Sequence, residues 1–394
     1  MDYKRRHELG QNRLSPISCM ASLSLRNCFS YFIFYNMLNS IREEILNLKA
    51  NFRIKEGVSV KLDQNETPWD IPERIKEKIL EDLRLTPFNR YPTLTEYHSI
   101  RKKLAEYINI DEDKLFISHG CDQIIFSFLL TFGGKGKKVL IFEPTYPLYR
   151  HFALLSGTEI KEVLLDEFYS IPREEADKLV KDVDLIIIAN PNNPTGNLQN
   201  KEIIIKLMDY QIPILLDEAY FNYTGVTFAE YVESHENLVI GRSFSKVFLA
   251  GIRLGYSISS PRIREIFETI NFTPFHLNHL NTVILKNIDL FGEWIEKKVQ
   301  CISSRREELF KNLEEIEGVL PYTSFTNFIL FRVENFSANY VYEKLIEKGV
   351  SIRDLSGVRG LSNHLRVTVG TEEENKIFLE KLQEVFYEGS ERDF

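Results

Sequence analysis

The sequence has little of what marks membrane or nucleic-acid-binding proteins. None of its apolar runs reaches the ~20 residues that a helix needs to cross a bilayer. Positive charge is not in excess, because 49 Lys and Arg face 57 Asp and Glu and leave a formal charge of −8. We therefore expect neither a membrane nor nucleic acid as a partner, and any anionic ligand must be bound by locally placed positive groups.

Cysteine is scarce, and its spacing does not indicate a metal site. The four cysteines, at positions 19, 28, 121 and 301, form no C-x-x-C pair, and the eight histidines are scattered. We expect no metal and no disulfide framework, which is consistent with a reducing cytoplasm. Cys121 is interpreted as a packed thiol rather than a nucleophile.

The N-terminal segment resembles a signal peptide only in part. An apolar stretch at residues 28–38 follows several arginines, but it contains polar residues and no small-residue cleavage site follows it. We expect residues 1–36 to lie outside the folded protein, with translation starting at Met37. Residues 37–65 are expected to form an arm that packs with a small C-terminal domain.

Short apolar runs alternate with helical patterns from residue 70 onward. The runs are LFIS (115–118), KVLIF (138–142), DLIIIA (184–189), IPILLD (212–217) and NLVIG (237–241). Because they are nearly continuous in apolar residues, they are typical of strands buried on both faces of a mostly parallel sheet.

The pattern changes after residue 262, where a long charged helical stretch leads to two further strands, at 327–333 and 364–370. We predict an α/β fold with two domains. The large one, residues 66–262, has a mostly parallel sheet between layers of helices, and the small α+β one spans residues 263–394.

Chemically versatile residues follow each of the five runs of the larger sheet. They are HGCD (119–122), EPTY (143–146), NPNNPTG (190–196), the acid and tyrosine of DEAY (217–220) and RSFSK (242–246). Since the carboxyl ends of parallel strands meet at one edge, the five loops imply one crevice. An amine, hydroxyls, arginines, an acid and a helix N-terminus together suit pyridoxal phosphate, which has an aldehyde, a phosphate, a basic ring nitrogen and a phenolic oxygen.

Other cofactor motifs are absent from the sequence. No G-x-G-x-x-G follows an early strand, which argues against a dinucleotide-binding fold. The GGKG cluster at residues 133–136 lacks the spacing of a phosphate-binding P-loop, so it is interpreted as a turn.

The order of the motifs resembles that of fold-type-I aminotransferases, specifically the histidinol-phosphate aminotransferase family. The resemblance extends from about residue 60 to 385. The matching motifs are NRYP (89–92), GCDQ (120–123), PTYPLY (144–149), NPNNPTG (190–196), DEAY (217–220), RSFSK (242–246), LAGIRLG (249–255) and HLRVTVG (364–370).

The resemblance implies a role for each residue around the cofactor ring. Lys246 would form the imine with pyridoxal phosphate and then move the proton between Cα and the cofactor. Asp217 would face the pyridine nitrogen and stabilise its protonated form. Asn193 and the catalytic Tyr220 would hydrogen-bond the phenolic oxygen, and Tyr146 would stack on the ring.

The resemblance also implies a phosphate-binding group. Ser243, Ser245 and Arg253 would bind the cofactor phosphate together with the main-chain N–H groups of Cys121 and Asp122. The side chain of Asp122 is expected to cap the helix that begins there. A further contact, from Tyr91, would come from the neighbouring subunit, so the family pattern implies a homodimer with shared sites.

Substrate-binding residues are likewise taken from the resemblance. Arg366 would bind the substrate carboxylate and Arg353 the distal phosphate of histidinol phosphate, while Asn65 and Asn327 would line the same pocket. A surface ion pair is the alternative for Arg353. Asn222 stands where the family often has an acid, which leaves the substrate open.

The predicted reaction passes the amino group of L-histidinol phosphate to 2-oxoglutarate and belongs to histidine biosynthesis. Two alternatives remain open because they use almost the same cofactor residues. One is an aromatic or other amino-acid aminotransferase, and the other is a decarboxylase of a phosphorylated amino acid such as threonine phosphate.

Overall fold

The structure is a computed structural model that describes residues 40–42, 45 and 57–390. The expectations for residues 1–36 and for most of the arm at 37–65 fall outside the described residues. The chain divides into two compact units, Met1–Asn51 and Phe52–Phe394, and the fold below is that of the second. Within the described ranges, no helix is long and apolar enough to span a bilayer.

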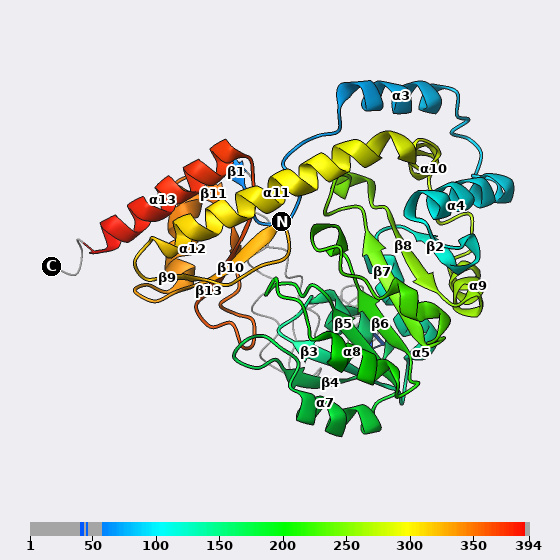
Figure 1. Cartoon of the computed structure of the whole chain (residues 1–394), viewed down its shortest axis with the longest axis horizontal. Helices are drawn as coiled ribbons and strands as arrows, with labels where there is room; N and C mark the ends of the chain where they lie inside the picture. Colours follow the sequence, from blue (N-terminus) through cyan, green and yellow to red (C-terminus); the bar gives the residue numbers. More distant parts are fainter. Residues whose placement is uncertain (1–39, 43–44, 46–56, 391–394) are drawn as a thin grey trace, which may run out of the picture. The chain divides into compact units, whose positions relative to one another are not determined.

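A seven-stranded sheet forms the centre of the larger part (Figure 1). Its strand order is β2-β8-β7-β6-β5-β3-β4; β8 runs antiparallel to both neighbours, and the other pairs are parallel. This confirms the predicted α/β fold with a mostly parallel sheet. The strands are β2 (Leu115–Ser118), β3 (Lys138–Glu143), β4 (Glu159–Leu164), β5 (Leu185–Ala189), β6 (Ile214–Asp217), β7 (Leu238–Ser243) and β8 (Gly255–Ser259).

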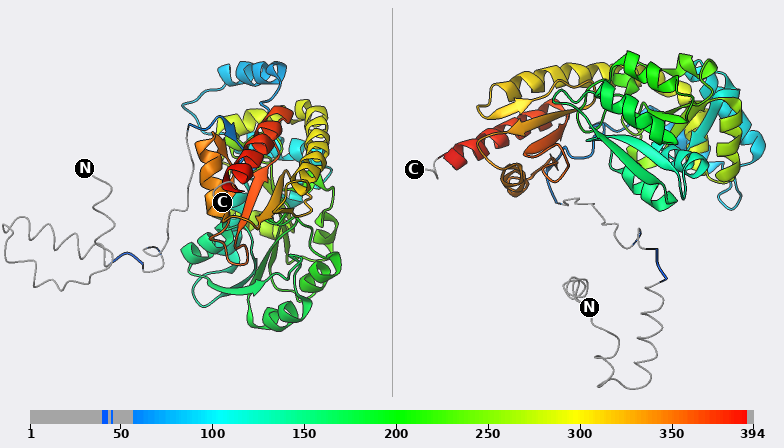
Figure 2. Two further views of the ribbon diagram at one scale, coloured as in Figure 1. Left: turned by 90° about the vertical axis from the view of Figure 1, so that its left-hand side faces the viewer. Right: turned by 90° about the horizontal axis from the view of Figure 1, so that it is seen from below.

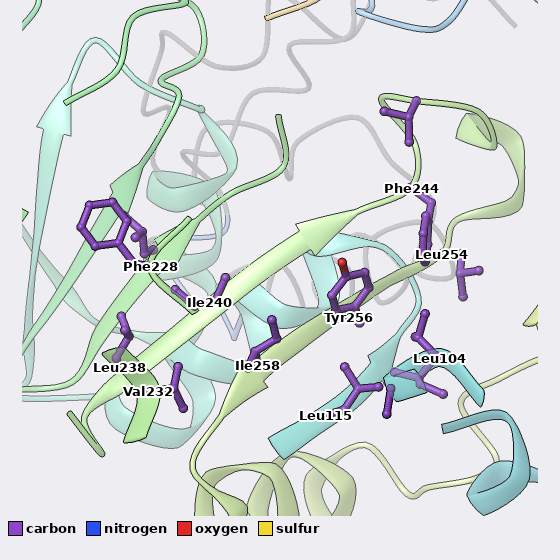
Figure 3. Packing of buried hydrophobic residues seen from close by; sticks show 14 of the residues in the cluster. Leu104, Leu115, Phe228, Val232, Leu238, Ile240, Phe244, Leu254, Tyr256 and Ile258 are labelled. Carbon is purple, nitrogen blue, oxygen red and sulfur yellow. The ribbon is translucent and has the colours of Figure 1, made fainter. Parts of the chain in front are cut away.

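Both faces of this sheet are covered, which explains the continuous apolar runs. Along β5, Ile186 and Ile188 enter one core cluster, while Leu185 and Ile187 enter another on the opposite face. Figure 3 shows part of the first cluster, where Ile240 of β7 and Ile258 of β8 lie near Leu115. The surrounding helices are α3 (Glu73–Arg84), α4 (Leu94–Ile108), α5 (Cys121–Phe132), α6 (Leu148–Ser156), α7 (Arg173–Leu179), α8 (Lys201–Met208), α9 (Pro261–Ile270) and α10 (His279–Lys286).

A second, smaller sheet follows later in the chain. It is antiparallel, with strand order β12-β13-β10-β9, and a separate parallel pair joins β1 to β11. The strands are β1 (Val60–Lys61), β9 (Val319–Pro321), β10 (Phe328–Val333), β11 (Val350–Ser351), β12 (Arg353–Asp354) and β13 (His364–Thr368). The helices are α11 (Gly292–Glu314), α12 (Ala338–Glu347) and α13 (Glu372–Ser390).

Helix α11 connects the two sheets. Its residue Ile295 belongs to the core of the large sheet, whereas Ile302, Leu309 and Leu313 belong to the core of the small one. Both views in Figure 2 show this long yellow helix beside the rest of the second unit. The division predicted between residues 262 and 263 stays a prediction, because the structure gives the whole of Phe52–Phe394 as one compact unit.

Short 3-10 helices fill several connections. They are η4 (Glu112–Lys114), η5 (Val180–Asp182), η6 (Phe221–Tyr223), η7 (Ala229–Glu233), η8 (Ala250–Ile252) and η9 (Ile288–Phe291). Of these short helices, η6 matters for the site because it directly follows the DEAY motif at the carboxyl end of β6.

Candidate active site

The five loops that follow β2, β3, β5, β6 and β7 meet in one pocket, as the crevice argument predicted. Most of the residues expected around a cofactor line it. The lining residues are Cys121, Asp122, Tyr146, Tyr149, Ala189, Pro191, Asn193, Asp217, Ala219, Tyr220, Ser243, Ser245, Lys246 and Arg253.

Lys246 lies in the loop after β7, with its amine inside the pocket. The Nζ atom donates to the carbonyl oxygen of Gln64 at 3.5 Å. Burial, helped by the positive charge of Arg366, lowers the pKa of Lys246 to about 8. The lysine carbonyl accepts hydrogen bonds from the Tyr223 hydroxyl at 2.6 Å and the Asn327 amide at 3.4 Å. A lysine in this state has a larger neutral, nucleophilic fraction near physiological pH than an ordinary lysine.

Asp217 ends β6 as a buried carboxylate, only 6% exposed. The Tyr149 hydroxyl donates to its Oδ2 at 2.7 Å, and the Ala219 N–H donates to its Oδ1 at 3.0 Å. The Cys121 thiol lies 3.5 Å from the same Oδ1. Burial raises the pKa of Asp217, and the hydrogen bond from Tyr149 is the largest opposing effect. Such an acid can partner a buried cationic group.

Tyr149 and the side chain of Cys121 are site residues that the sequence reasoning missed. Tyr149 ends the PTYPLY motif, in which only Tyr146 was expected to contact a cofactor. The available signal was its position three residues after Tyr146, which places both side chains on one face of a helical turn.

The guanidinium of Arg253 lies against the N-terminus of α5. Gly120 is the N-cap with φ +79°, and a Cβ there would come within 2.9 Å of Arg253 Nη2, so the guanidinium closes over this backbone. Arg253 donates to Ser245 Oγ at 3.3 Å and to Asp122 Oδ2 at 2.6 Å. The first N–H groups of a helix have no acceptor within the helix, so a helix start beside an arginine is suited to an anion.

The capping role predicted for Asp122 is wrong. Its carboxylate forms the ion pair with Arg253 and accepts a hydrogen bond from the Tyr146 hydroxyl at 3.1 Å, and α5 has no side-chain cap. Asp122 is the second helical residue after Gly120, so it stands past the N-cap position from which a side chain reaches back to the first turn.

Arg366 of β13 reaches the pocket from the small sheet. It donates to Asn193 Oδ1 at 2.6 Å and to the carbonyl oxygen of Asp63 at 3.0 Å. Its Nε is buried and, among the described residues, has no hydrogen-bond partner. Burial lowers the pKa of Arg366 to about 10. A buried guanidinium with a spare donor is suited to a bidentate anion.

Asn65 and Asn327 lie together beside Tyr220. The Asn65 amide donates to the Tyr220 hydroxyl at 2.8 Å, and the Asn327 amide donates to the Asn65 carbonyl at 2.9 Å. Asn65 has φ +57°, a conformation that asparagine tolerates better than most residues. Thr368 of β13 fixes this conformation by accepting from the Asn65 N–H at 2.9 Å.

Five predicted residues lie outside the pocket lining. Arg366, Asn65 and Asn327 each hydrogen-bond to a lining residue, whereas Arg353 and Tyr91 form no such bond within the described part of the chain. Arg353 of β12 pairs in register with Arg366, and its charge contributes to lowering the pKa of Arg366. The alternative of a surface ion pair finds no support, because no ion pair of Arg353 is found in the part of the chain that the structure describes. Tyr91 is 72% exposed, and its ring packs edge-on against Phe275 at 5.2 Å.

Comparison with known proteins shows the family of this chain. A family model described as aminotransferase class I and II matches residues 58–382. The chain belongs to this family. Within it, a histidinol-phosphate aminotransferase of Pyrococcus furiosus is 35% identical over 350 residues, which cover 88% of this chain and 98% of that protein.

Solved structures of the family share the fold. The crystal structure of the histidinol-phosphate aminotransferase from Clostridium acetobutylicum matches with a TM-score of 0.77 and 27% identity, and the match covers 84% of this chain and 99% of that chain. The Sinorhizobium meliloti histidinol-phosphate aminotransferase, solved in complex with pyridoxal-5'-phosphate, matches with a TM-score of 0.78 and 20% identity over 89% of this chain and 98% of that one.

Proposed function

We propose that the protein is a pyridoxal-phosphate-dependent histidinol-phosphate aminotransferase of histidine biosynthesis. The amino group of L-histidinol phosphate passes to 2-oxoglutarate, which yields imidazole-acetol phosphate and glutamate. The observation that carries this proposal is the 35% identity to a histidinol-phosphate aminotransferase over nearly its whole length. The pocket supports it, because an amine and a buried acid share one crevice.

The residues of the pocket fit pyridoxal phosphate. Each polar part of this cofactor has a matching group: Lys246 for the aldehyde, Asp217 for the ring nitrogen, Asn193 with Tyr220 for the phenolic oxygen, and the start of α5 with Arg253 for the phosphate. A side chain at Gly120 would displace the guanidinium of Arg253 and would be strained by the φ of +79°. A backbone without a Cβ gives a phosphate direct access to the N–H groups of the helix start.

Pyridoxal phosphate, when bound, supplies an aldehyde carbon for the substrate amine and a ring that accepts electrons from Cα. Around it, Asp217 holds a negative charge in a buried position, which favours a proton on the facing nitrogen. Lys246, with its pKa lowered to about 8, can both accept and return a proton near neutral pH. Asn193 and Tyr220 are our candidates for the phenolic oxygen, and Tyr146 for the ring face.

The two arginines of neighbouring strands are our candidates for substrate recognition. Arg366 is buried, has a donor with no partner among the residues that the structure describes, and is oriented by Asn193 and Asp63. It would therefore bind the anionic group common to both substrates. Arg353 lies beside it and would add the charge that a dianionic phosphate requires.

We further propose a cytoplasmic homodimer in which each site is completed by Tyr91 of the partner copy. Two properties support this. The ring of Tyr91 is largely exposed, and it packs with Phe275, itself 58% exposed, while Phe88 and Phe272 nearby in sequence are each 76% exposed. Exposed aromatic clusters of this kind are typical of interfaces.

A half-reaction screen tests the function. Protein loaded with pyridoxal phosphate is mixed with L-histidinol phosphate, glutamate, phenylalanine or threonine phosphate, and the loss of the cofactor's visible absorption is followed together with carbon dioxide release. Fast bleaching by histidinol phosphate and glutamate without carbon dioxide is expected. Preference for phenylalanine, or carbon dioxide from threonine phosphate, would contradict the proposal in favour of one of the alternatives.

A further inference from the structure

The carboxylate of Asp217 is held by a tyrosine that the proposed mechanism does not use. Tyr149 lies in the first turn of α6 and is 1% exposed, and its hydroxyl donates to Asp217 Oδ2 at 2.7 Å. The other two contacts of the carboxylate, from the Ala219 N–H and the Cys121 thiol, are both to Oδ1. Tyr149 is thus the donor to Oδ2 within the described residues.

We propose that Tyr149 is a positioning residue that keeps Asp217 ionised and oriented toward the ring nitrogen of pyridoxal phosphate. The inference rests on the proposed function, since it assigns the task of Tyr149 within that same site. Tyr149 itself does not touch the reacting atoms in this assignment. It acts through the carboxylate.

The arrangement of donors explains why the hydroxyl matters. An ionised carboxylate has about four lone-pair positions. Donors on both oxygens fix its plane and leave the remaining lone pairs for a cationic N–H. The thiol is a weak donor at 3.5 Å, so the phenol is the stronger of the two side-chain donors. Without it, Oδ2 would be a buried oxygen lacking a hydrogen-bond donor, which favours protonation.

The electrostatic surroundings make the carboxylate dependent on such a donor. The titratable groups that interact with Asp217 are Tyr149 of α6, Cys121 and Asp122 of α5, and Tyr146 and Tyr220 in the loops after β3 and β6. The negative charge of Asp122 disfavours a second charge nearby. Burial is the largest effect and also raises the pKa of Asp217, because it removes water from the charged form. Hydrogen bonds to the charged form oppose both effects, and the one from Tyr149 is the largest.

Packing alone does not require a hydroxyl at this position. The Tyr149 ring belongs to the apolar cluster around α5 and stands edge-on to Tyr146, with centroids 5.7 Å apart. Phenylalanine would preserve these contacts, because it differs only by the oxygen. The substitution Tyr149→Phe therefore removes the donor and leaves the packing of the ring in place.

The test compares full-length wild type with Tyr149→Phe, each loaded with pyridoxal phosphate labelled with ¹⁵N in the ring. The ¹⁵N chemical shift reports whether the proton lies on the ring nitrogen. In Tyr149→Phe we expect it to move from the pyridinium value toward that of neutral pyridine, since a less acidic Asp217 competes for the proton. Cofactor affinity should fall roughly tenfold, the size expected for one hydrogen bond to a charged group, and kcat should fall without a change in KM.

Two further variants separate positioning from a general structural effect. In the Asp217→Asn background, adding Tyr149→Phe should leave affinity and ¹⁵N shift unchanged, because the tyrosine acts only through the carboxylate. Tyr322→Phe is the matched control. It removes a hydroxyl that is 3.0 Å from His364 Nε2 and outside the pocket lining, and it should resemble wild type.

Each outcome bears on one claim. Provided that wild type binds the cofactor, two results would overturn the role of Tyr149. One is an unchanged ¹⁵N shift and cofactor affinity in Tyr149→Phe. The other is an equal loss of affinity from Tyr149→Phe in the presence and in the absence of the Asp217 carboxylate. If wild type itself fails to bind pyridoxal phosphate, the proposed function fails and the inference fails with it.

Discussion

The amine of Lys246 lies in a pocket where two arginines, Arg366 and Arg253, oppose its protonation in addition to burial. Its pKa of about 8 implies a direct pH dependence, because only the neutral amine can react with an aldehyde. The protonated form dominates below that pH, so the rate at which cofactor-free protein takes up pyridoxal phosphate should rise about tenfold per pH unit up to 8 and then level off. Stopped-flow absorbance between about pH 6 and about pH 10 measures this rate of uptake. A rate independent of pH would contradict the lowered pKa.

Removing the amine should abolish the cofactor's covalent attachment and its proton transfer at once. For Lys246→Ala we expect loss of the visible absorption that the bound cofactor shows in wild type, and a fall in turnover by several orders of magnitude. Lys61→Ala is a suitable control, since this lysine is paired with Asp63 and Glu66 and does not line the pocket. An unchanged spectrum of Lys246→Ala would reject the assignment.

Arg353 should distinguish the two substrates. If Arg353 binds the phosphate, Arg353→Ala should weaken the binding of histidinol phosphate by ~2 kcal/mol, the size expected for a charged hydrogen-bonded partner. The binding of glutamate should be nearly unaffected. Half-reaction titrations with each substrate measure this difference. Equal effects on the binding of both substrates would mean that Arg353 does not bind the phosphate.

Residues that line the pocket could be predicted where a short motif specified them. Lys246 and Asp217 follow directly from RSFSK and DEAY, and both line the pocket. The partner of Asp122 could not be predicted, because Arg253 is 131 positions away in sequence and only the fold brings the two together. Tyr149 was missed for the same reason, since its partner lies 68 positions further along the chain.

At the level of elements, strands with a continuous apolar run were predicted well and the others poorly. The run at residues 115–118 corresponds to β2. Strand β4 was missed because it lies at the sheet edge and alternates charged with apolar residues, so its sequence EIKEVL lacks a continuous apolar run. Strand β8 was missed because Gly and Ser interrupt its sequence GYSIS, although all of it is buried.

A buried ion pair connects the ends of β6 and β7. Glu218 is fully buried and its Oε2 lies 2.9 Å from Arg242 Nη2, while the guanidinium stacks 3.7 Å above the Phe221 ring. Glu218→Ala should lower the free energy of unfolding by ~3–5 kcal/mol, because it leaves Arg242 buried without its counter-charge. Urea unfolding of the cofactor-free protein measures the change.

An exposed ion pair provides the control for this experiment. Lys297 and Glu293 of α11 form a pair at i,i+4 in which both side chains are mostly exposed. Glu293→Ala should leave the urea midpoint essentially unchanged, since solvent screens such pairs. Similar losses for Glu218→Ala and Glu293→Ala would show that burial does not determine the effect.

At the scale of the whole molecule, a shared active site predicts complementation between inactive subunits. Tyr91→Ala and Lys246→Ala proteins should each be weakly active alone. A mixed dimer would contain one site with both residues intact, so unfolding and refolding an equal mixture should recover about a quarter of wild-type activity if subunits pair at random. Activity assays after mixing measure this gain. No recovery would argue that Tyr91 serves its own subunit or none.

The arrangement of the two sheets could be predicted only in outline. The change of pattern near residue 262 predicted further strands beyond it, and a second sheet made of β12, β13, β10 and β9 lies there. The sequence did not reveal that the core of the large sheet continues to Ile295 through α10 and α11. Amphipathic helices carry no information about which sheet they will cover.

The pairing of β1 with β11 has a consequence for how the protein is made. Val60 and Lys61 pair with Val350 and Ser351, and the adjoining Asn65 is bound by Thr368, 303 positions later. On the ribosome, the segment that ends at Asn65 is synthesised early but meets these partners only when the last part of the chain has emerged. The contact between Asn65 and the pocket residue Tyr220 can thereby be secured only near the end of translation, and a polypeptide that stopped before Val350 would lack both anchors of this early segment.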